Sequence, residues 1–228
     1  MAPLSFTVRK VQPSDLKPKK RPQQARSRAS FAAILDACAR LLSDHGYEML
    51  TTNRIAEQAG VGIATLYEFF PNKEAVVAEL AASLMAKIEA DMEKAFAEAS
   101  SMEPWPAVQH MTDCGVRSLV EDRAVFRVLL REVPFVPHLP AVREARAALS
   151  ALSQRVRIRA GDALDLPMPK EDVWLLSGML YNATLEIAFL ETSEKKRAEL
   201  TKELARLTYR MAVGRDPERI KAPAPPSP

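Results

Sequence analysis

The chain has 228 residues, of which 47% are apolar, and a net charge of +3. Only seven glycines, together with much Ala, Leu, Glu and Arg, favour an all-helical protein. Two cysteines are too few for a disulfide scaffold, and we expect no secretory signal, so the composition argues against a disulfide-rich secreted protein. We therefore expect a cytoplasmic chain that forms one large domain, or a small domain joined to a larger one.

The positive charge is concentrated at the N-terminus. Residues 1–30 hold eight basic side chains and one acidic side chain, so the remaining residues carry a net negative charge. Residues 1–23 contain four prolines and no apolar period, which predicts a disordered basic arm. Two interpretations stay open for this arm: a solvated tail, or a segment that follows DNA phosphates or enters the minor groove.

The first expected helix runs from about Gln24 to His45, and Gly46 is a natural C-terminal stop. Apolar residues recur at helical spacing on one of its faces: Phe31, Ile34, Leu35, Cys38, Leu41 and Leu42. Because Cys38 belongs to this stripe, we interpret it as a small core residue and not as a redox sensor.

Residues 51–70 predict two short helices that meet at a glycine-containing turn. The first helix has an inner stripe of aliphatic and small residues, and the second has two apolar residues four apart. Small residues at the crossing let two helices pack closely at a steep angle, as a helix-turn-helix needs in order to place its second helix in a DNA major groove. The residues concerned are Ile55, Ala56, Ala59, Gly60, Val61, Leu66 and Phe70.

The same segment resembles the DNA-binding signature of the tetracycline-repressor (TetR) family of bacterial transcription regulators. The matching positions are Thr51, Ile55-Ala56, Ala59-Gly60-Val61, Leu66-Tyr67, Phe70 and Lys73-Glu74. The resemblance implies a three-helix DNA-binding domain over residues 24–72, followed by a larger helical domain over residues 73–214 that binds an effector and dimerises. Residues 215–228 are expected to be a loose tail.

Candidate DNA contacts follow from these positions. Hydroxyls at a helix N-terminus can cap the helix and meet a phosphate, and methyl groups at the start of the recognition helix can meet thymine. The phenol of Tyr67 and the ammonium of Lys73 are suited to phosphate, and the resemblance carries both over. Arg28 would supply a basic group outside the recognition helix. The full set is Arg28, Thr51, Thr52, Gly62, Ile63, Ala64, Thr65, Tyr67 and Lys73.

Glu68 departs from what a DNA-binding surface favours, because it places a negative charge near the phosphates. Its side chain either points away from the DNA backbone, which we favour, or accepts a hydrogen bond from a cytosine amine. Gly62 and Phe69 also stand where the family more often has residues that can hydrogen-bond. Each of these departures lowers the expected affinity without removing the motif.

After Pro71, Asn72 can cap a long helix that extends to about Ser100. We read residues 103–106 as a break and expect further helices over 107–120, 123–132, 140–160, 170–191 and 193–213. The most apolar stretch, residues 173–190, contains Asn182 and Glu186, which would be costly in lipid. We therefore predict a buried or interface helix there and no membrane span.

The larger domain offers candidates for an effector pocket, although aromatic residues and Met at helical spacing fit core packing as well. These candidates are Trp105, Met111, Phe126, Leu130, Trp174, Tyr181 and Asn182, with Glu186 as a possible second polar anchor. The resemblance also implies that the last two helices pair with their copies in a dimer. The residues expected at that interface are Leu176, Leu180, Ala183, Leu204 and Met211.

His110, His138 and Cys114 lack metal-ligand spacing, and we find no nucleophile motif or phosphate-binding glycine loop. We therefore predict no metal, no cofactor and no enzymatic activity. The predicted function is a homodimeric, ligand-responsive transcription regulator, by resemblance a repressor, that binds a palindromic operator in double-stranded DNA and is released by a small apolar or amphipathic effector. The alternative is a sequence-tolerant architectural or protein-interaction module without an effector.

Overall fold

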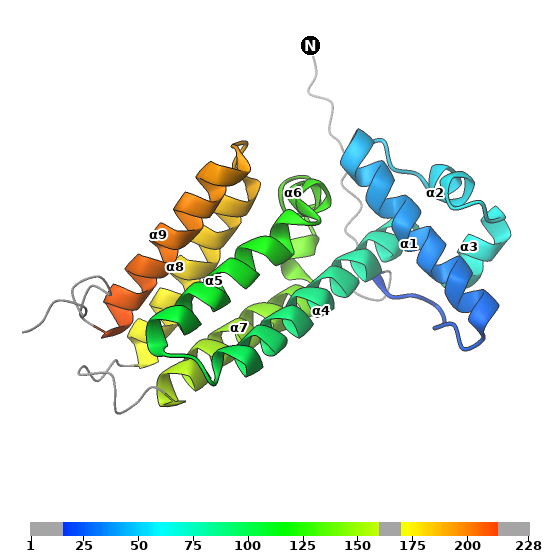
Figure 1. The fold of residues 1–228 in the computed structure, drawn as a ribbon. Helices are drawn as coiled ribbons and strands as arrows, with labels where there is room; N and C mark the ends of the chain where they lie inside the picture. The colour runs from blue at the N-terminus through cyan, green and yellow to red at the C-terminus, as the bar shows by residue number, and fades with distance from the viewer. Residues whose placement is uncertain (1–15, 160–169, 214–228) are drawn as a thin grey trace, which may run out of the picture. The chain divides into compact units, whose positions relative to one another are not determined.

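A computed structural model describes residues 16–159 and 170–213. These residues form helices and no strand, which confirms the predicted all-α fold. The first four helices are α1 (Ala25–His45), α2 (Thr52–Gln58), α3 (Ile63–Phe69) and α4 (Lys73–Ala99). They are followed by α5 (Pro104–Val120), α6 (Arg123–Arg131), the 3-10 helix η2 (Val136–His138), α7 (Pro140–Arg159), α8 (Lys170–Phe189) and α9 (Glu194–Val213) (Figure 1).

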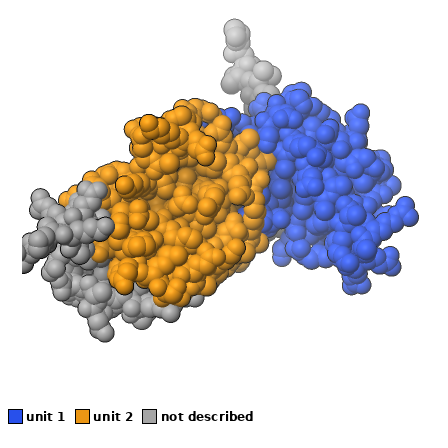
Figure 2. Space-filling model, viewed as in Figure 1, with its two compact units in different colours: residues 1–84, 127–142 blue, residues 85–126, 143–228 orange. Residues whose placement is uncertain are grey.

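The chain divides into two compact units, which Figure 2 distinguishes by colour. Unit 1 comprises residues 1–84 and 127–142, and unit 2 comprises residues 85–126 and 143–228. Unit 1 is larger than the 24–72 domain expected from the sequence, because it adds the first part of α4 and the segment that follows Phe126. The chain therefore passes from one unit to the other within α4, within α6 and near the start of α7.

The core of unit 1 is built on the apolar stripe of α1. Ile34, Cys38 and Leu42 are completely buried, whereas Leu35, which was expected in the same stripe, is half-buried. The ring of Phe31 packs edge-on against Phe69 and tilted against Phe70, with ring centroids 5.5 and 4.9 Å away. Burial raises the pKa of the Cys38 thiol to about 12, so the reactive thiolate is scarce at neutral pH and the core interpretation of this residue is supported.

Local capping sets the ends of the helices in unit 1. Thr51 is the N-cap of α2, where its Oγ1 accepts a hydrogen bond from the backbone N–H of Arg54 at 3.3 Å. Asn72 closes the first turn of α4 in the same way, accepting from the N–H of Ala75 at 2.7 Å. The turn between α2 and α3 needs Gly60, whose φ of 66° would strain any residue with a Cβ. The sequence-based caps at Thr51 and Asn72 are thus both present.

The expected break at residues 103–106 is wrong, because α5 already begins at Pro104. Both prolines lie in the first turn of the helix, where the backbone N–H groups have no intrahelical partner and a missing donor costs little. Trp105 therefore belongs to α5. Its ring packs against Tyr209 of α9 with centroids 5.6 Å apart.

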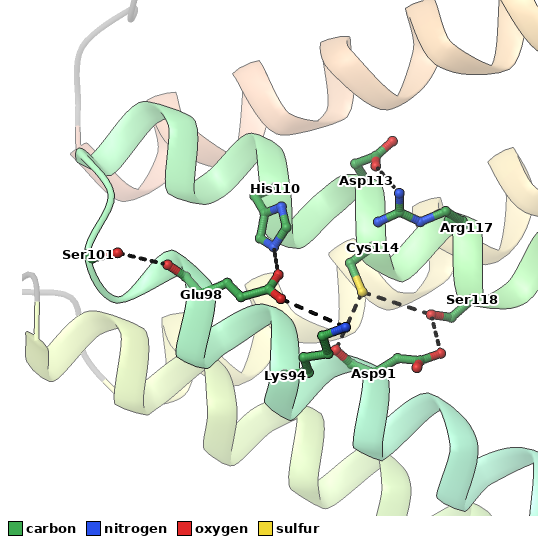
Figure 3. A network of polar contacts seen from close by, with 9 residues as sticks. All are labelled: Asp91, Lys94, Glu98, Ser101, His110, Asp113, Cys114, Arg117 and Ser118. Carbon is green, nitrogen blue, oxygen red and sulfur yellow. Dashed lines mark hydrogen bonds and ion pairs between the residues drawn. The ribbon is translucent and has the colours of Figure 1, made fainter.

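In unit 2, α5 packs against both α8 and α9, which also pack against each other. A network of polar contacts joins α5 to the second part of α4 (Figure 3). The Ser118 hydroxyl donates to the Asp91 carboxylate at 3.0 Å, and the Cys114 thiol donates to the Asp91 carbonyl at 3.6 Å. About two turns further along α4, Glu98 lies 2.9 Å from the His110 ring nitrogen. These contacts fix the register of α5 along α4.

Two kinds of feature are missing from the part of the chain that the structure describes. None of its helices combines the length and the apolar character needed to cross a bilayer. Nor do three or more His, Cys, Asp or Glu side chains gather there in a group that could hold a metal ion.

Candidate nucleic-acid interface

Helix α3 has one buried face and one exposed face. Leu66 and Phe69 point into the core of unit 1, with 0% and 3% of their surface exposed. Ile63 and Tyr67, which lie on the other side, are 39% and 42% exposed, and Gly62 and Ala64 are exposed as well. A short helix anchored on one side and open on the other is what insertion into a major groove requires.

A contact between two hydroxyls joins the exposed sides of α2 and α3. The Oγ1 of Thr52 lies 3.1 Å from the phenol oxygen of Tyr67. Thr51 and Thr52 stand at the beginning of α2, and Thr65 lies half-buried in the first turn of α3. The structure thus brings two of the predicted hydroxyl groups, those of Thr52 and Tyr67, into contact with each other. Arg28 lies in the first turn of α1, where its guanidinium donates to the carbonyl of Gln23.

Lys73 makes contacts within the protein that the sequence did not reveal. Its ammonium donates to the carbonyl of Leu50 at 3.0 Å and to that of Tyr47 at 3.4 Å, and it lies 4.4 Å from the centroid of the Tyr47 ring. The side chain therefore ties the loop between α1 and α2 to the start of α4. A phosphate contact by Lys73 stays a prediction, and it would have to compete with these interactions.

Tyr47 is a second residue whose importance sequence reasoning missed. Its backbone N–H donates to the Glu132 carboxylate at 3.1 Å, and its ring lies 6.2 Å from that of Phe135. Its phenol donates to the Glu74 carboxylate at 3.3 Å. Burial raises the pKa of Tyr47, and the negative charge of Glu74 raises it further, so the phenol stays protonated and keeps donating. No local sequence pattern connects Tyr47 with a partner 85 residues away.

The N-terminal segment has defined contacts where the structure describes it. The sequence predicted a disordered arm through residue 23, and residues 1–15 of that arm lie outside the described residues. Lys20 forms an ion pair with Glu68 at 2.8 Å. Arg21 pairs with Glu79 of α4. The sequence analysis left two orientations open for the Glu68 side chain. In the structure its carboxylate is directed toward Lys20.

The residues predicted to bind an effector are distributed over the two units. Leu130 belongs to unit 1, whereas the other candidates belong to unit 2. Trp174 is 68% exposed, and Asn182 is an exposed residue whose amide donates to the carbonyl of Gly178 in the same helix. Phe126 is buried, Trp105 and Met111 are half-buried, and Tyr181 lies beneath the Arg146 guanidinium. Glu186 lies exposed on α8.

The residues predicted to form a dimer interface lie along α8 and α9. Leu176, Leu180, Ala183 and Leu204 are half-buried within unit 2, and Met211 is 47% exposed. Larger exposed side chains accompany them on the same two helices: Trp174, Leu175, Met179 and Leu207, with exposures of 68%, 54%, 60% and 44%.

Comparison with known proteins relates this fold and this helix-turn-helix to one family. Residues 34–80 match the family model described as bacterial regulatory proteins, tetR family. The fatty acid metabolism regulator protein of Bacillus subtilis (strain 168) is 33% identical over 67 residues, or 29% of this chain and 34% of that protein. The chain thus spans about a third of the length of this relative.

Two solved structures share the fold over most of the chain. The fatty acid degradation regulator FadR from Bacillus halodurans superimposes with a TM-score of 0.67, at 17% identity over 83% of this chain and 97% of that one. The transcriptional regulator FadR from Bacillus subtilis, solved in complex with stearoyl-CoA, gives a TM-score of 0.62 at 19% identity, over 78% of this chain and 97% of the other.

Lys73 and Tyr67 are expected to behave differently when they are replaced. Lys73→Ala leaves two backbone carbonyls without their charged donor, so it should lower the free energy of unfolding by about 1–2 kcal/mol in urea titrations. Tyr67→Phe removes one exposed hydroxyl and should change the free energy of unfolding by less than about 0.5 kcal/mol. Lys17→Ala, which removes an exposed ammonium, is the control for loss of charge. A Lys73→Ala variant as stable as the wild type, with a shallower salt dependence of DNA affinity, would instead assign the ammonium to a phosphate.

Proposed function

Because the chain belongs to the TetR family of bacterial regulatory proteins, we propose that it represses transcription by binding an inverted-repeat operator as a homodimer. A small apolar or amphipathic effector would then release it from the DNA. The observation that carries this proposal is helix α3, anchored by Leu66 and Phe69 and exposed at Ile63, Ala64 and Tyr67. A helix held in this manner can enter a major groove as a rigid body.

The exposed part of α3 determines how such a regulator would read DNA. Ile63, Ala64 and Thr65 offer methyl groups, which suit the C5 methyl of thymine. No Arg, Asn or Gln stands between Gly62 and Phe70 to form a bidentate contact with a base. Recognition is therefore expected to depend on thymine methyls and on DNA shape, with phosphates fixing the register of the helix.

The exposed apolar side chains of α8 and α9 support a homodimer. Trp174 and Met179 on α8, and Leu207 and Met211 on α9, are each at least 44% exposed. Large apolar side chains gathered on neighbouring helices are characteristic of protein interfaces. We therefore assign Trp174 to the dimer surface instead of an effector pocket. Two identical heads related by two-fold symmetry would require an operator with the same symmetry.

The path of the chain supports a response to an effector. Residues 127–142 connect at both ends to unit 2, yet they belong to unit 1, where Glu132 and Phe135 contact Tyr47. An effector that shifts α6 or α7 would thereby act on the loop before α2. Its effect on DNA affinity is limited by the difference in its own affinity for the two conformations.

DNA selection tests the central proposal. The wild-type chain, incubated with duplexes containing a random segment, should enrich an inverted repeat with thymine in its half-sites. The half-site centres should be separated by about 10 base pairs or a multiple of that distance. Footprinting of an enriched duplex should then show one discrete protected region. Uniform protection without an enriched sequence would favour the architectural alternative.

The proposed dimer surface can be tested with two matched substitutions. Met179→Glu places a charge on the exposed side of α8 and should convert the dimer to a monomer in sedimentation velocity runs, with loss of tight operator binding. Met102→Glu makes the same chemical change at a methionine that is 40% exposed but lies outside α8 and α9, and it should leave the dimer intact. A Met179→Glu variant that remains dimeric and binds the operator would place the interface elsewhere.

Acyl-CoA thioesters are a defined first class of effector to test, since a structural relative was solved with stearoyl-CoA. Stearoyl-CoA should release the chain from its selected operator in fluorescence anisotropy, whereas coenzyme A without the acyl chain should not, because the proposed effector must supply apolar surface. Release by coenzyme A alone, or by neither compound, would exclude acyl-CoA thioesters as the effector class.

A further inference from the structure

The C-terminal end of α3 is closed by the segment that precedes α1. Helix α3 has only seven residues, and the last carbonyls of any helix lack partners within the helix. The backbone N–H of Lys19 donates to the carbonyl of Phe69 at 2.7 Å. The ammonium of the same residue donates to the carbonyl of Tyr67 at 2.9 Å. Lys19 thus satisfies two terminal carbonyls and places a positive charge at the negative end of the helix dipole.

The next residue, Lys20, neutralises the one carboxylate on α3. Its ammonium lies 2.8 Å from the Glu68 carboxylate and 5.4 Å from the centroid of the Phe69 ring. The side chains of Lys20 and Glu68 are 55% and 57% exposed, so the pair lies at the surface beside Tyr67. Without Lys20, Glu68 would present an uncompensated negative charge on the same helix that is proposed to approach DNA phosphates.

Arg21 attaches this segment to a second helix. Its guanidinium forms two parallel hydrogen bonds with the Glu79 carboxylate, at 2.8 and 3.2 Å. The Glu79 side chain is only 11% exposed and stands among the buried residues of α4. A two-bonded arginine–carboxylate pair fixes geometry as well as charge. Three consecutive basic residues therefore bridge the end of α3 and the first part of α4.

We infer that residues 19–21, which we call the arm clip, are positioning residues that hold the recognition helix and cancel the charge of Glu68 so that α3 can approach DNA. This inference rests on the proposed DNA-binding function. The contacts of the arm clip assign these three cations to α3 and α4, which differs from both interpretations left open for the arm, a solvated tail and a segment that follows DNA phosphates. Lys20 acts on DNA affinity through Glu68 and not by direct contact.

The first test uses the DNA-free protein. Because the Lys19 amide donates to a carbonyl of α3, hydrogen exchange measured by NMR should show it protected, in contrast to the amide of the exposed Lys17 in the same segment. Arg21→Ala should lower this protection by releasing the clip from α4. An unprotected Lys19 amide in the wild-type chain would overturn the inference whatever the DNA measurements show.

The second test is a double-mutant cycle on a duplex enriched by the wild-type chain. Lys20→Ala should weaken binding by about fivefold, the upper range for an exposed ion pair. In a Glu68→Gln background the same substitution should have no effect, because Lys20 then has no charge to cancel. Lys17→Ala is the matched control, and any effect it has should be equal in both backgrounds.

The outcomes separate the two roles of Lys20. If Lys20 contacts a phosphate directly, Lys20→Ala weakens binding equally in both backgrounds and lowers the salt slope by about one unit, and the inference is wrong. If the wild-type chain enriches no DNA at all, the proposed function fails and the DNA role of the clip fails with it. That failure is distinguishable from failure of the clip itself, because the exchange of the Lys19 amide is measured without DNA.

Discussion

The packing of Phe31 on α1 against Phe69 and Phe70 is the interaction on which the helix-turn-helix of this protein depends. An isolated helix of seven residues is not stable in water, because the free-energy cost of nucleating it exceeds the stabilisation that its few hydrogen bonds provide. Helix α3 therefore exists because its inner side is held by aromatic contacts of 4.9 and 5.5 Å between ring centroids. The exposed side can then vary in sequence without loss of the helix.

Polar contacts complete what the aromatic core begins, and they use several of the charges near α3. Lys73 holds the loop before α2 through the carbonyls of Leu50 and Tyr47, and Lys19 holds the end of α3. A positive charge near a helix-turn-helix is therefore not by itself a phosphate contact. Before a basic side chain is assigned to a phosphate, its hydrogen bonds to carbonyls and carboxylates of the protein have to be considered.

The sequence predicted those parts of the structure that depend on local chemistry. The apolar period of α1, the cap at Thr51 and the glycine-containing turn at Gly60 each follow from neighbouring residues, and each is present. Contacts between residues far apart in the sequence could not be predicted from a local pattern. Lys19 donates a hydrogen bond to the carbonyl of Tyr67, 48 positions away, and Tyr47 donates one to Glu132, 85 positions away. The prolines of the arm predicted disorder, but an extended segment can be fixed by contacts to another element, as residues 19–21 are.

The same limit applies to Trp174, because periodicity identifies the apolar residues of a helix but not what covers them. Trp174 is 68% exposed in the single chain. The proposed dimer would cover this residue together with the exposed Leu175 and Met179. A sequence pattern for burial cannot distinguish burial within one chain from burial between two.

An ionic cluster in unit 2 lies close in sequence to two of the points where the chain passes between the units. Lys87, just after the point where α4 enters unit 2, pairs with Glu121 at 3.0 Å and with Asp122 at 2.9 Å. Its hydrogen bond to Asp122 raises the pKa of Lys87, and the bond to Glu121 adds to this, so the ammonium keeps its charge. Asp122 directly precedes α6, in which the chain returns to unit 1. Two of the three places where the chain passes between the units therefore lie within a few residues of one ionic cluster.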